Sequence, residues 1–127
     1  MTNEELISMA EKAMEYSYSP YSGFKVGAAA LGLSGTVYTG TNIENASYGA
    51  TVCAERCAIF KGVSEGEKGF SKIAIVCGEN RPAPPCGMCL QVMTEFMDPE
   101  SGEILLEDKG EIKVFRLKEL IPLAFKL

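Results

Sequence analysis

The chain has 127 residues, of which 46% are hydrophobic and 23% charged, and its formal net charge at pH 7 is −5; this is typical of one globular domain covering residues 1–127. Its 12 basic residues are scattered among 17 acidic ones, which argues against a nucleic-acid partner, since polyanions are bound mainly through clustered Lys and Arg. No apolar run approaches the roughly 20 residues of a membrane-spanning helix, and the acidic N-terminus is unlike a signal peptide, so we expect no membrane partner and a cytoplasmic location.

The first half of the chain is predicted to begin with a helix and a β-hairpin. Thr2, with an acidic residue three positions later, is typical of a helix N-terminus, and apolar residues recur at helical spacing over residues 3–17. Residues 24–31 and 36–42 are short segments separated by a glycine-containing turn, which indicates a hairpin. The polar segment 42–49 fits an ordinary surface loop and a set of hydrogen-bonding groups beside a ligand equally well.

The second half of the chain alternates helices with strands. Its predicted elements are a helix at 52–62 that ends at Gly62, a buried strand at 72–77, a helix at 87–97, strands at 103–106 and 111–115, and a helical turn at 117–120. This order favours an α/β fold, specifically a three-layer α/β/α domain around one mixed sheet of about five strands.

The chain contains no histidine and five cysteines. The absence of histidine excludes Ser-His-Asp and Cys-His catalysis and every zinc site with an imidazole ligand. A transition metal would have to be bound through thiolates, and cysteines of cytoplasmic proteins are more often metal ligands or buried residues than disulfide partners. Cys77, within an apolar strand, is expected to lie in the core.

Three of the cysteines have spacings that suit one metal ion. Cys86 and Cys89 follow a Pro-Pro pair where a helix is expected to begin, and Cys53 is expected to open another helix. Helix N-termini favour the negative charge of thiolates. Three protein ligands around a zinc ion leave its fourth position for water, which is the arrangement of a catalytic site.

The residues that follow the first cysteine leave two interpretations open. Glu55, in the first helical turn, could accept a proton from a metal-activated water and deliver it to a substrate nitrogen. Arg56 would offset the charge of the thiolates if it reaches them, and otherwise is a solvated helix charge. Cys57, however, stands one helical turn after Cys53 and could close a four-thiolate structural site with no room for water.

Several motifs resemble the cytidine deaminase family. Cys-Ala-Glu at 53–55 and Pro-Cys-Gly-Met-Cys at 85–89 match the zinc-deaminase signature, a ligand-x-Glu followed by Pro-Cys-x-x-Cys. The likeness extends from Tyr-Ser-Pro-Tyr-Ser at 18–22 and Phe-Lys-Val-Gly-Ala-Ala at 24–29 to Leu-Ile-Pro-Leu-Ala-Phe at 120–125, and so covers nearly the whole chain. A cysteine as the first ligand is similar to the small deaminases that act on free nucleosides.

The resemblance implies zinc-dependent hydrolytic deamination of cytidine and deoxycytidine to uridine and deoxyuridine, with release of ammonia, as in pyrimidine salvage. It implies one zinc per subunit, bound by Cys53, Cys86 and Cys89, with Arg56 hydrogen-bonded to the thiolates. Glu55 would protonate the ring nitrogen as the activated water attacks, and would then pass a proton to the departing amine.

The resemblance also implies roles in substrate binding. Asn42 and Glu44 would hold the ribose hydroxyls. Phe24 would pack against the pyrimidine, and the backbone of Ala54 would help to hold the ring carbonyl. Family members of this length are typically homotetramers with shared sites, and the residues lent to the neighbouring subunit would be Ala46, Tyr48 and Phe125.

Three positions depart from the family pattern. Leu90 stands where the family usually has Arg, so a polar contact at the subunit interface would be lost. Cys57 replaces a common Thr and adds a thiol beside the zinc, and the chain ends two residues after Phe125. Two alternatives to the nucleoside deaminase remain: a deaminase of a modified cytosine nucleoside such as an antibiotic, and a non-enzymatic domain with a four-cysteine zinc site.

Overall fold

Five strands form one mixed sheet in the computed structural model, which describes residues 1–127. The sheet order is β2-β1-β3-β4-β5, in which only β3 and β4 run parallel. The parallel pair requires a crossover connection, which a helix provides. The strands are β1 (Val26–Gly32), β2 (Val37–Thr41), β3 (Phe70–Cys77), β4 (Glu103–Asp108) and β5 (Glu111–Arg116).

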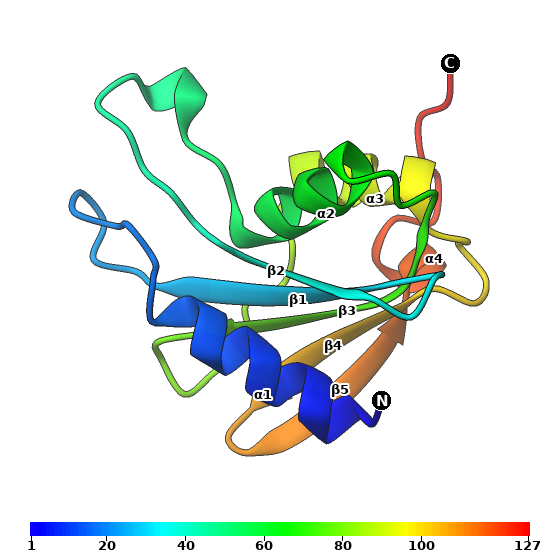
Figure 1. Cartoon of the computed structure of the whole chain (residues 1–127), viewed down its shortest axis with the longest axis horizontal. Coiled ribbons are helices and arrows are strands. Elements are labelled where there is room, and N and C mark those ends of the chain that lie inside the picture. Colours follow the sequence, from blue (N-terminus) through cyan, green and yellow to red (C-terminus); the bar gives the residue numbers. More distant parts are fainter.

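Helices cover both faces of this sheet (Figure 1). Helix α1 (Asn3–Met14) lies on one face, and α2 (Ala54–Ser64) and α3 (Gly87–Phe96) lie on the other. The 3-10 turn η1 (Tyr48–Ala50) and the short α4 (Leu117–Leu120) complete the secondary structure. The three-layer α/β/α architecture is therefore confirmed. No helix combines the length and the apolar character needed to cross a bilayer.

Side chains of the central strands alternate between two cores. In β3, Ile73 and Ile75 belong to the larger cluster, on the side of α2 and α3, whereas Ala74 and Val76 belong to the smaller cluster beneath α1. Successive residues of a strand point to opposite faces, so a sheet covered on both sides needs apolar residues at consecutive positions. This is why β3 is a continuous apolar run.

The ends of two predicted helices were wrong. Helix α1 ends at Met14 instead of residue 17, because the chain leaves the helix to pair with a distant segment: the Tyr18 backbone N–H donates to the Asn42 carbonyl (3.1 Å). Helix α2 does not end at Gly62 but continues to Ser64. A Cβ at Gly62 would lie 2.7 Å from the Phe70 ring, so this glycine permits close packing instead of ending the helix.

A glycine also sets the distance between β2 and α2. A Cβ on Gly40 would lie 2.5 Å from the backbone nitrogen of Ala58 and 2.7 Å from the carbonyl oxygen of Ala54. Only glycine therefore allows the strand to approach the first turns of α2 this closely. Those turns carry the first cysteine motif.

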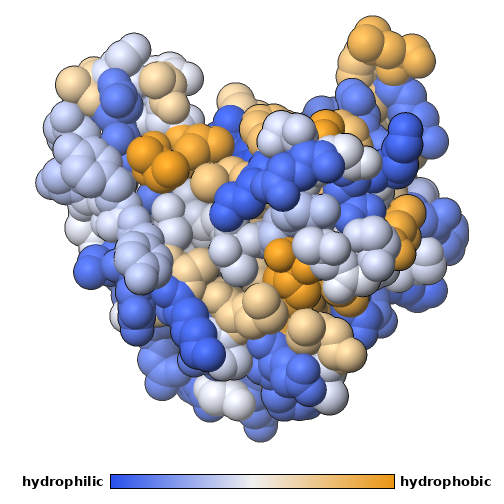
Figure 2. Space-filling view, in the orientation of Figure 1, coloured by the Kyte–Doolittle hydropathy of each residue, from blue (hydrophilic) through white to orange (hydrophobic).

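Two segments project from the sheet on the side of α2 and α3 (Figure 1). The first, which we call the finger, comprises residues 43–52 and is closed at its base by a bridge between Ile43 and Val52. The second is the C-terminal tail, residues 121–127, where Leu123 is 95% exposed and Phe125 66% exposed. Figure 2 shows these projections on either side of a hollow, with apolar side chains at the end of the tail.

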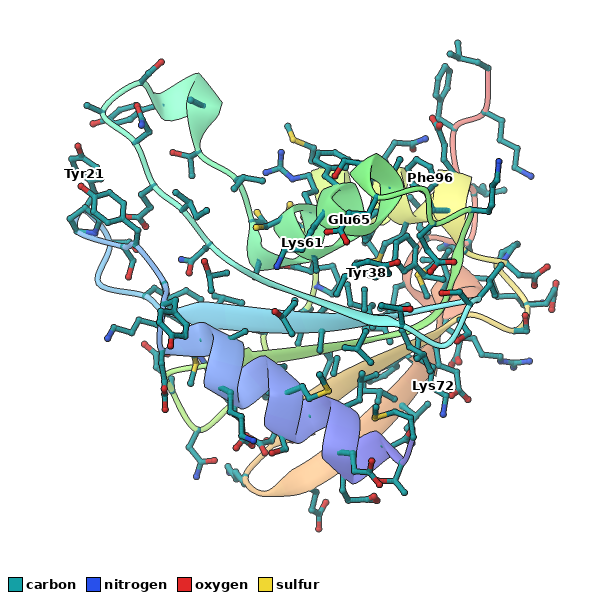
Figure 3. The ribbon with its side chains drawn as sticks, in the orientation of Figure 1. Tyr21, Tyr38, Lys61, Glu65, Lys72 and Phe96 are labelled. Carbon is teal, nitrogen blue, oxygen red and sulfur yellow. The ribbon has the colours of Figure 1, made fainter.

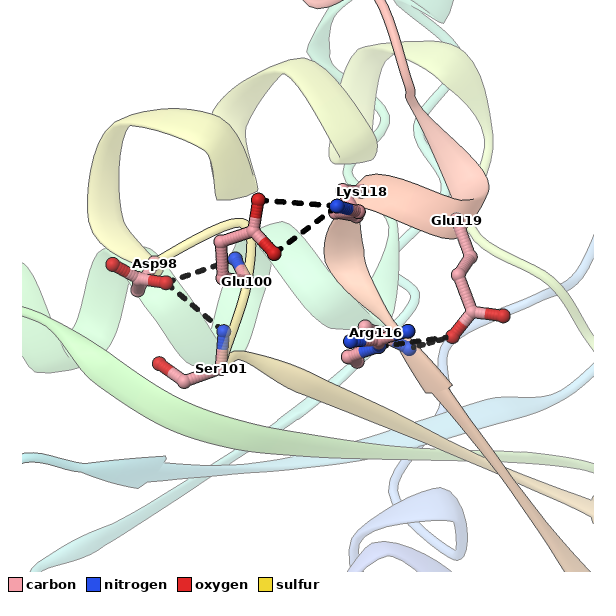
Figure 4. Close-up of polar contacts among 6 residues, drawn as sticks. All are labelled: Asp98, Glu100, Ser101, Arg116, Lys118 and Glu119. Atoms are coloured by element: carbon pink, nitrogen blue, oxygen red, sulfur yellow. Dashed lines mark hydrogen bonds and ion pairs between the residues drawn. The ribbon is translucent and has the colours of Figure 1, made fainter.

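The start of the tail is held by polar contacts between the turn after α3 and α4 (Figure 4). The Asp98 carboxylate accepts hydrogen bonds from the backbone N–H groups of Glu100 (2.8 Å) and Ser101 (2.9 Å). Lys118 of α4 pairs with Glu100 at 3.1 Å. These contacts fix where the tail leaves the domain.

Candidate active site and metal centre

The thiols of Cys53, Cys86 and Cys89 form one cluster, in which all three Sγ atoms lie within 4.8 Å of one another. Cys53 is the N-cap residue of α2, Cys86 is the N-cap residue of α3, and Cys89 lies in the first turn of α3. The N-termini of the two helices thus meet at the cluster. Both termini present backbone N–H groups and positive dipole ends that favour thiolates.

The cluster fits a zinc ion. Sulfurs bound tetrahedrally to one zinc at about 2.3 Å would lie about 3.8 Å apart, and the Cys53 and Cys86 sulfurs are 3.9 Å apart. Cys89 is buried, Cys53 is half-buried and Cys86 is exposed. The cluster is therefore open on one side, as a catalytic zinc site requires.

Arg56 supplies positive charge to the thiols. Its Nη2 donates to the Cys53 sulfur at 3.4 Å. The pKa of Cys53 is lowered to about 5, chiefly because the Cys89 thiol donates a hydrogen bond to its sulfur and also because of the adjacent guanidinium. The pKa of Cys89 is raised, because that thiol is the donor and is buried. The guanidinium is therefore not a solvated helix charge.

Cys57 lies outside the cluster. The group of residues placed to bind a metal contains three cysteines, and Cys57 instead lines a separate depression with Tyr16, Thr39 and Lys61. Helical spacing directs residues i and i+4 to the same face, but Cys53 is the N-cap residue and has extended backbone dihedral angles. The one-turn spacing therefore does not bring these two sulfurs together, and the geometry gives no support to a four-cysteine site.

Glu55 is the buried carboxyl group of the site, with 5% of its surface exposed. Burial, and to a smaller degree the charge of Cys53, raises the pKa of Glu55 to about 7. The residue lines the same cavity as Cys53 and Cys86. A carboxyl group shielded from bulk water beside an open metal site can hold a proton and return it.

The cavity has a volume of about 300 Å³ and brings together most of the predicted site residues. Its walls contain the following seven: Phe24, Asn42, Glu44, Cys53, Ala54, Glu55 and Cys86. About half of the lining residues are hydrophobic, which is usual for a pocket that binds a small organic molecule through a few polar groups.

Asn42 is fixed by its own hydrogen bonds. Its Oδ1 accepts from the Val26 backbone N–H (3.0 Å) and from the Ser17 hydroxyl, and its Nδ2 donates to the Phe24 carbonyl at 2.7 Å. An amide has two N–H donors, so one donor remains available to a ligand.

Glu44 is fixed in a similar way. One carboxylate oxygen accepts from the backbone N–H groups of Tyr21 (2.9 Å) and Ser22 (3.1 Å), and the other accepts from the Ser22 hydroxyl. The Ser22 hydroxyl in particular lowers the pKa of Glu44. Because each carboxylate oxygen accepts about two hydrogen bonds, the second oxygen retains room for a ligand hydroxyl.

Several lining residues were not predicted. They are Ser22, Val26, Thr51, Val52, Ala83 and Pro84. Each lies within three residues of a predicted site residue in the sequence, which is the signal that could have identified them. The proline-rich loop before Cys86 reaches the cavity because it connects the end of β3 to the first turn of α3.

Three predicted substrate-binding residues, Ala46, Tyr48 and Phe125, do not line this cavity. Ala46 and Tyr48 belong to the finger, and Phe125 belongs to the tail. Tyr48 is 82% exposed and borders a surface depression that adjoins the cavity, because Glu44 and Thr51 line both. Figure 3 shows Tyr21 at the tip of a loop beside the finger.

The sequence is similar to a deaminase family model and to the sequences of known cytidine deaminases. Residues 1–101 match the family model described as the cytidine and deoxycytidylate deaminase zinc-binding region. A cytidine deaminase of Halalkalibacterium halodurans is 48% identical over 98% of this chain and 95% of that protein. A cytidine deaminase of Sporosarcina psychrophila is 46% identical over 98% of this chain and 92% of that protein.

Solved structures agree with these sequence matches. The crystal structure of a cytidine deaminase from Burkholderia pseudomallei superposes with a TM-score of 0.92 at 44% identity, covering 98% of this chain and all of that one. A cytidine deaminase from Mycobacterium tuberculosis superposes with a TM-score of 0.84 at 38% identity, with both chains fully covered.

Proposed function

The chain belongs to the cytidine and deoxycytidylate deaminase family, and on that premise we propose that it is a zinc-dependent hydrolase that deaminates cytidine and deoxycytidine to uridine and deoxyuridine. The observation that carries this proposal is the buried carboxyl of Glu55 in the same cavity as the three-thiol cluster. A structural zinc site would need neither the carboxyl nor the cavity.

The reaction adds water to the C4 carbon of the cytosine ring and breaks the bond between C4 and the exocyclic nitrogen. Zinc held by Cys53, Cys86 and Cys89 would supply Lewis acidity, which makes a water molecule acidic enough to lose a proton near neutral pH. Glu55 accepts that proton and places it on ring nitrogen N3. Glu55 then takes the proton of the new hydroxyl group on C4 and gives it to the exocyclic amine, which leaves as ammonia while C4 becomes a carbonyl, so that the ring becomes uracil.

Arg56 and the two helix N-termini serve the thiolates during this reaction. Three thiolates around a divalent ion carry an excess negative charge, which would weaken its Lewis acidity. The Nη2 group of Arg56 lies 3.4 Å from the Cys53 sulfur, and the dipoles of α2 and α3 add positive potential. These groups preserve the acidity that the reaction requires.

Asn42 and Glu44 would hold the sugar. The remaining N–H of Asn42 donates to a ribose hydroxyl, and the free acceptor position of Glu44 accepts from one. Both side chains are already fixed by hydrogen bonds, so the substrate does not have to order them. Such preorganisation reduces the entropic cost of binding.

Phe24 and Ala54 would hold the base. The Phe24 ring forms an apolar wall of the cavity against which the pyrimidine packs. Ala54 is the first residue of α2, and the first N–H groups of a helix have no intrahelical partner. The Ala54 N–H can therefore donate to the ring carbonyl.

We further propose a homotetramer in which Ala46, Tyr48 and Phe125 complete the site of a neighbouring subunit. We also propose that the enzyme is cytoplasmic and serves pyrimidine salvage. Support comes from the position of these residues on two projections, outside the cavity of their own chain. The exposure of Tyr48, Leu123 and Phe125 leaves apolar surface that an assembly would cover. The five unpaired cysteines suit a reducing compartment.

The function is tested by following cytidine absorbance with purified protein whose zinc content has been measured. We expect cytidine and deoxycytidine to be consumed with release of one ammonia each, and we expect turnover to stop after chelation and to return when zinc is added. Zinc-loaded protein that converts neither nucleoside would overturn the proposal.

A further inference from the structure

Arg81 lies over the aromatic wall of the cavity without lining the cavity itself. Its guanidinium carbon is 5.0 Å from the centre of the Phe24 ring. Phe24 borders the cavity, whereas Arg81 does not. The guanidinium is therefore placed to act on a molecule in the cavity through the ring.

The guanidinium is held in this position from its own loop. Its Nε donates to the Glu79 carboxylate at 2.6 Å, and its Nη1 donates to the Pro82 carbonyl at 3.2 Å. The Arg81 backbone is fixed as well, because its N–H donates to the Glu79 carbonyl (2.9 Å) and its carbonyl accepts from the Cys77 thiol (3.3 Å). Arg81 is thus a restrained cation in the loop that follows β3.

Phe24, in contrast, is only partly held by the core. It lies two residues before β1, is half-buried, and packs against the edge of the larger hydrophobic cluster. Its backbone is anchored through the Ser22 hydroxyl (3.0 Å) and the Asn42 side chain (2.7 Å). These contacts fix the main chain and do not themselves set the orientation of the ring.

We propose that Arg81 is a positioning residue that fixes the Phe24 ring as the wall on which the pyrimidine packs, with Glu79 holding the guanidinium in place. This inference rests on the proposed deaminase function. A cation is attracted to the electron-rich face of an aromatic ring, and two of the guanidinium nitrogens are already engaged with Glu79 and Pro82. The ring is ordered before the substrate arrives, so Arg81 acts on substrate binding and not on the bond-breaking step.

The first test is steady-state kinetics with cytidine. Arg81→Ala is expected to raise KM by about two- to fivefold, the range for an exposed cation–ring contact, while kcat changes by less than about twofold. Arg81→Lys should recover most of the loss. The control is Lys113→Ala, which removes another exposed, ion-paired cation and should leave both constants unchanged. An unchanged KM in Arg81→Ala, or an equal effect in the control, overturns the proposal.

A double-mutant cycle tests whether Arg81 acts through the ring. In a Phe24→Leu background, Arg81→Ala should change KM by less than about 1.5-fold, because the partner of the cation is gone. If the full effect of Arg81→Ala persists in that background, Arg81 acts directly on substrate and the proposed positioning role is wrong.

A spectroscopic measurement separates this inference from the deaminase function. The Phe24 ring resonances, assigned by comparison with Phe24→Leu, should shift in Arg81→Ala, recover in Arg81→Lys and stay in place in Lys113→Ala. If the native protein does not convert cytidine, the function fails but these resonances still report on the contact. Unchanged resonances in Arg81→Ala would overturn the positioning role regardless of activity.

Discussion

At the scale of single residues, the proposed proton transfer depends on the carboxyl group of Glu55. Glu55→Gln keeps the shape and burial of the side chain but removes its ability to exchange a proton. We expect kcat/KM for cytidine to fall by about 100-fold or more, the usual contribution of an acid–base group, with zinc content and thermal stability retained. The measurement combines the absorbance assay with metal analysis and calorimetry. Turnover close to that of the native protein would contradict the proton-transfer role.

Cys57 provides a second test at this scale. Because it stands apart from the three-thiol cluster, Cys57→Thr is expected to retain one zinc per subunit and most of its activity. Cys89→Ser, which removes a buried member of the cluster, should lose zinc. Metal analysis after dialysis measures the zinc content of both variants. Loss of zinc from Cys57→Thr would indicate a four-cysteine site and would refute the open geometry.

Some of these residues could be identified from sequence and others could not. The spacing of Cys53, Cys86 and Cys89 and the absence of histidine predicted a thiolate metal site, because ligand chemistry restricts the choice, but they left Cys57 open as a fourth ligand. The contact between Arg81 and Phe24 was not predictable, since it joins two loops 57 positions apart and has no local pattern. For the same reason, the sequence did not indicate that Asn42 is held by Ser17.

At the scale of secondary-structure elements, the approach of β2 to α2 depends on Gly40. A methyl group there would contact backbone atoms of α2 at 2.5 and 2.7 Å. Backbone cannot move aside as a flexible side chain can, so Gly40→Ala is expected to cost about 1–3 kcal/mol of unfolding free energy and to disturb the start of α2. Denaturant unfolding measures the loss. Gly78→Ala, whose new methyl would meet neighbours at ordinary distances of 3.8 Å or more, is the control; an equal loss in both variants would contradict the argument.

The contact between α1 and β4 should make stability depend on pH. Burial, together with the nearby Glu11 of α1, raises the pKa of Glu107 in β4. A carboxyl group whose folded pKa exceeds its unfolded value disfavours the ionised folded state, so its cost is present at neutral pH and disappears as pH falls towards the unfolded value. Glu107→Gln should therefore raise the melting temperature at pH 7, and the gain should shrink towards about pH 5.

The matched control for this pH dependence lies in the same strand. Glu103 pairs with Lys72 at 3.4 Å, so Glu103→Gln removes an attraction and should give no gain at pH 7. Melting temperatures of both variants, measured across this pH range, test the prediction. A gain for Glu107→Gln that is independent of pH, or that grows in acid, would show that ionisation of Glu107 is not its cause.

The types and order of the elements were predictable, but some of their limits were not. Alternating apolar segments and turn residues identified the strands and helices because these patterns are local. Helix α1 ends early because the chain pairs with residues near Asn42, and α2 continues past Gly62 because that glycine faces Phe70. Both limits are set by tertiary contacts, which override local preference.

At the scale of the whole molecule, the finger and the tail carry the three predicted substrate-binding residues that do not line the cavity of their own chain, Ala46, Tyr48 and Phe125. A shared site predicts that two defective subunits can restore each other. Phe125→Ala should lower cytidine turnover in the site of the neighbouring subunit. Glu55→Gln inactivates the site of the subunit that carries it. In a mixed assembly, the Glu55→Gln subunit lends an intact Phe125 to a partner that has an intact Glu55. Activity after mixing and subunit exchange should therefore exceed the sum of the two variants.

The control mixture combines Glu55→Gln with Cys86→Ser. Both of these changes affect the part of the site that one chain builds alone, so every cavity in the mixture keeps one defect and no activity should return. Light scattering on each variant gives the size of the assembly, which we expect to be four subunits. Because Phe125 is 66% exposed, its replacement should not unfold the chain. Recovery that is absent from the Phe125→Ala mixture would place the complete site within one subunit, and the two projections would then need a different role.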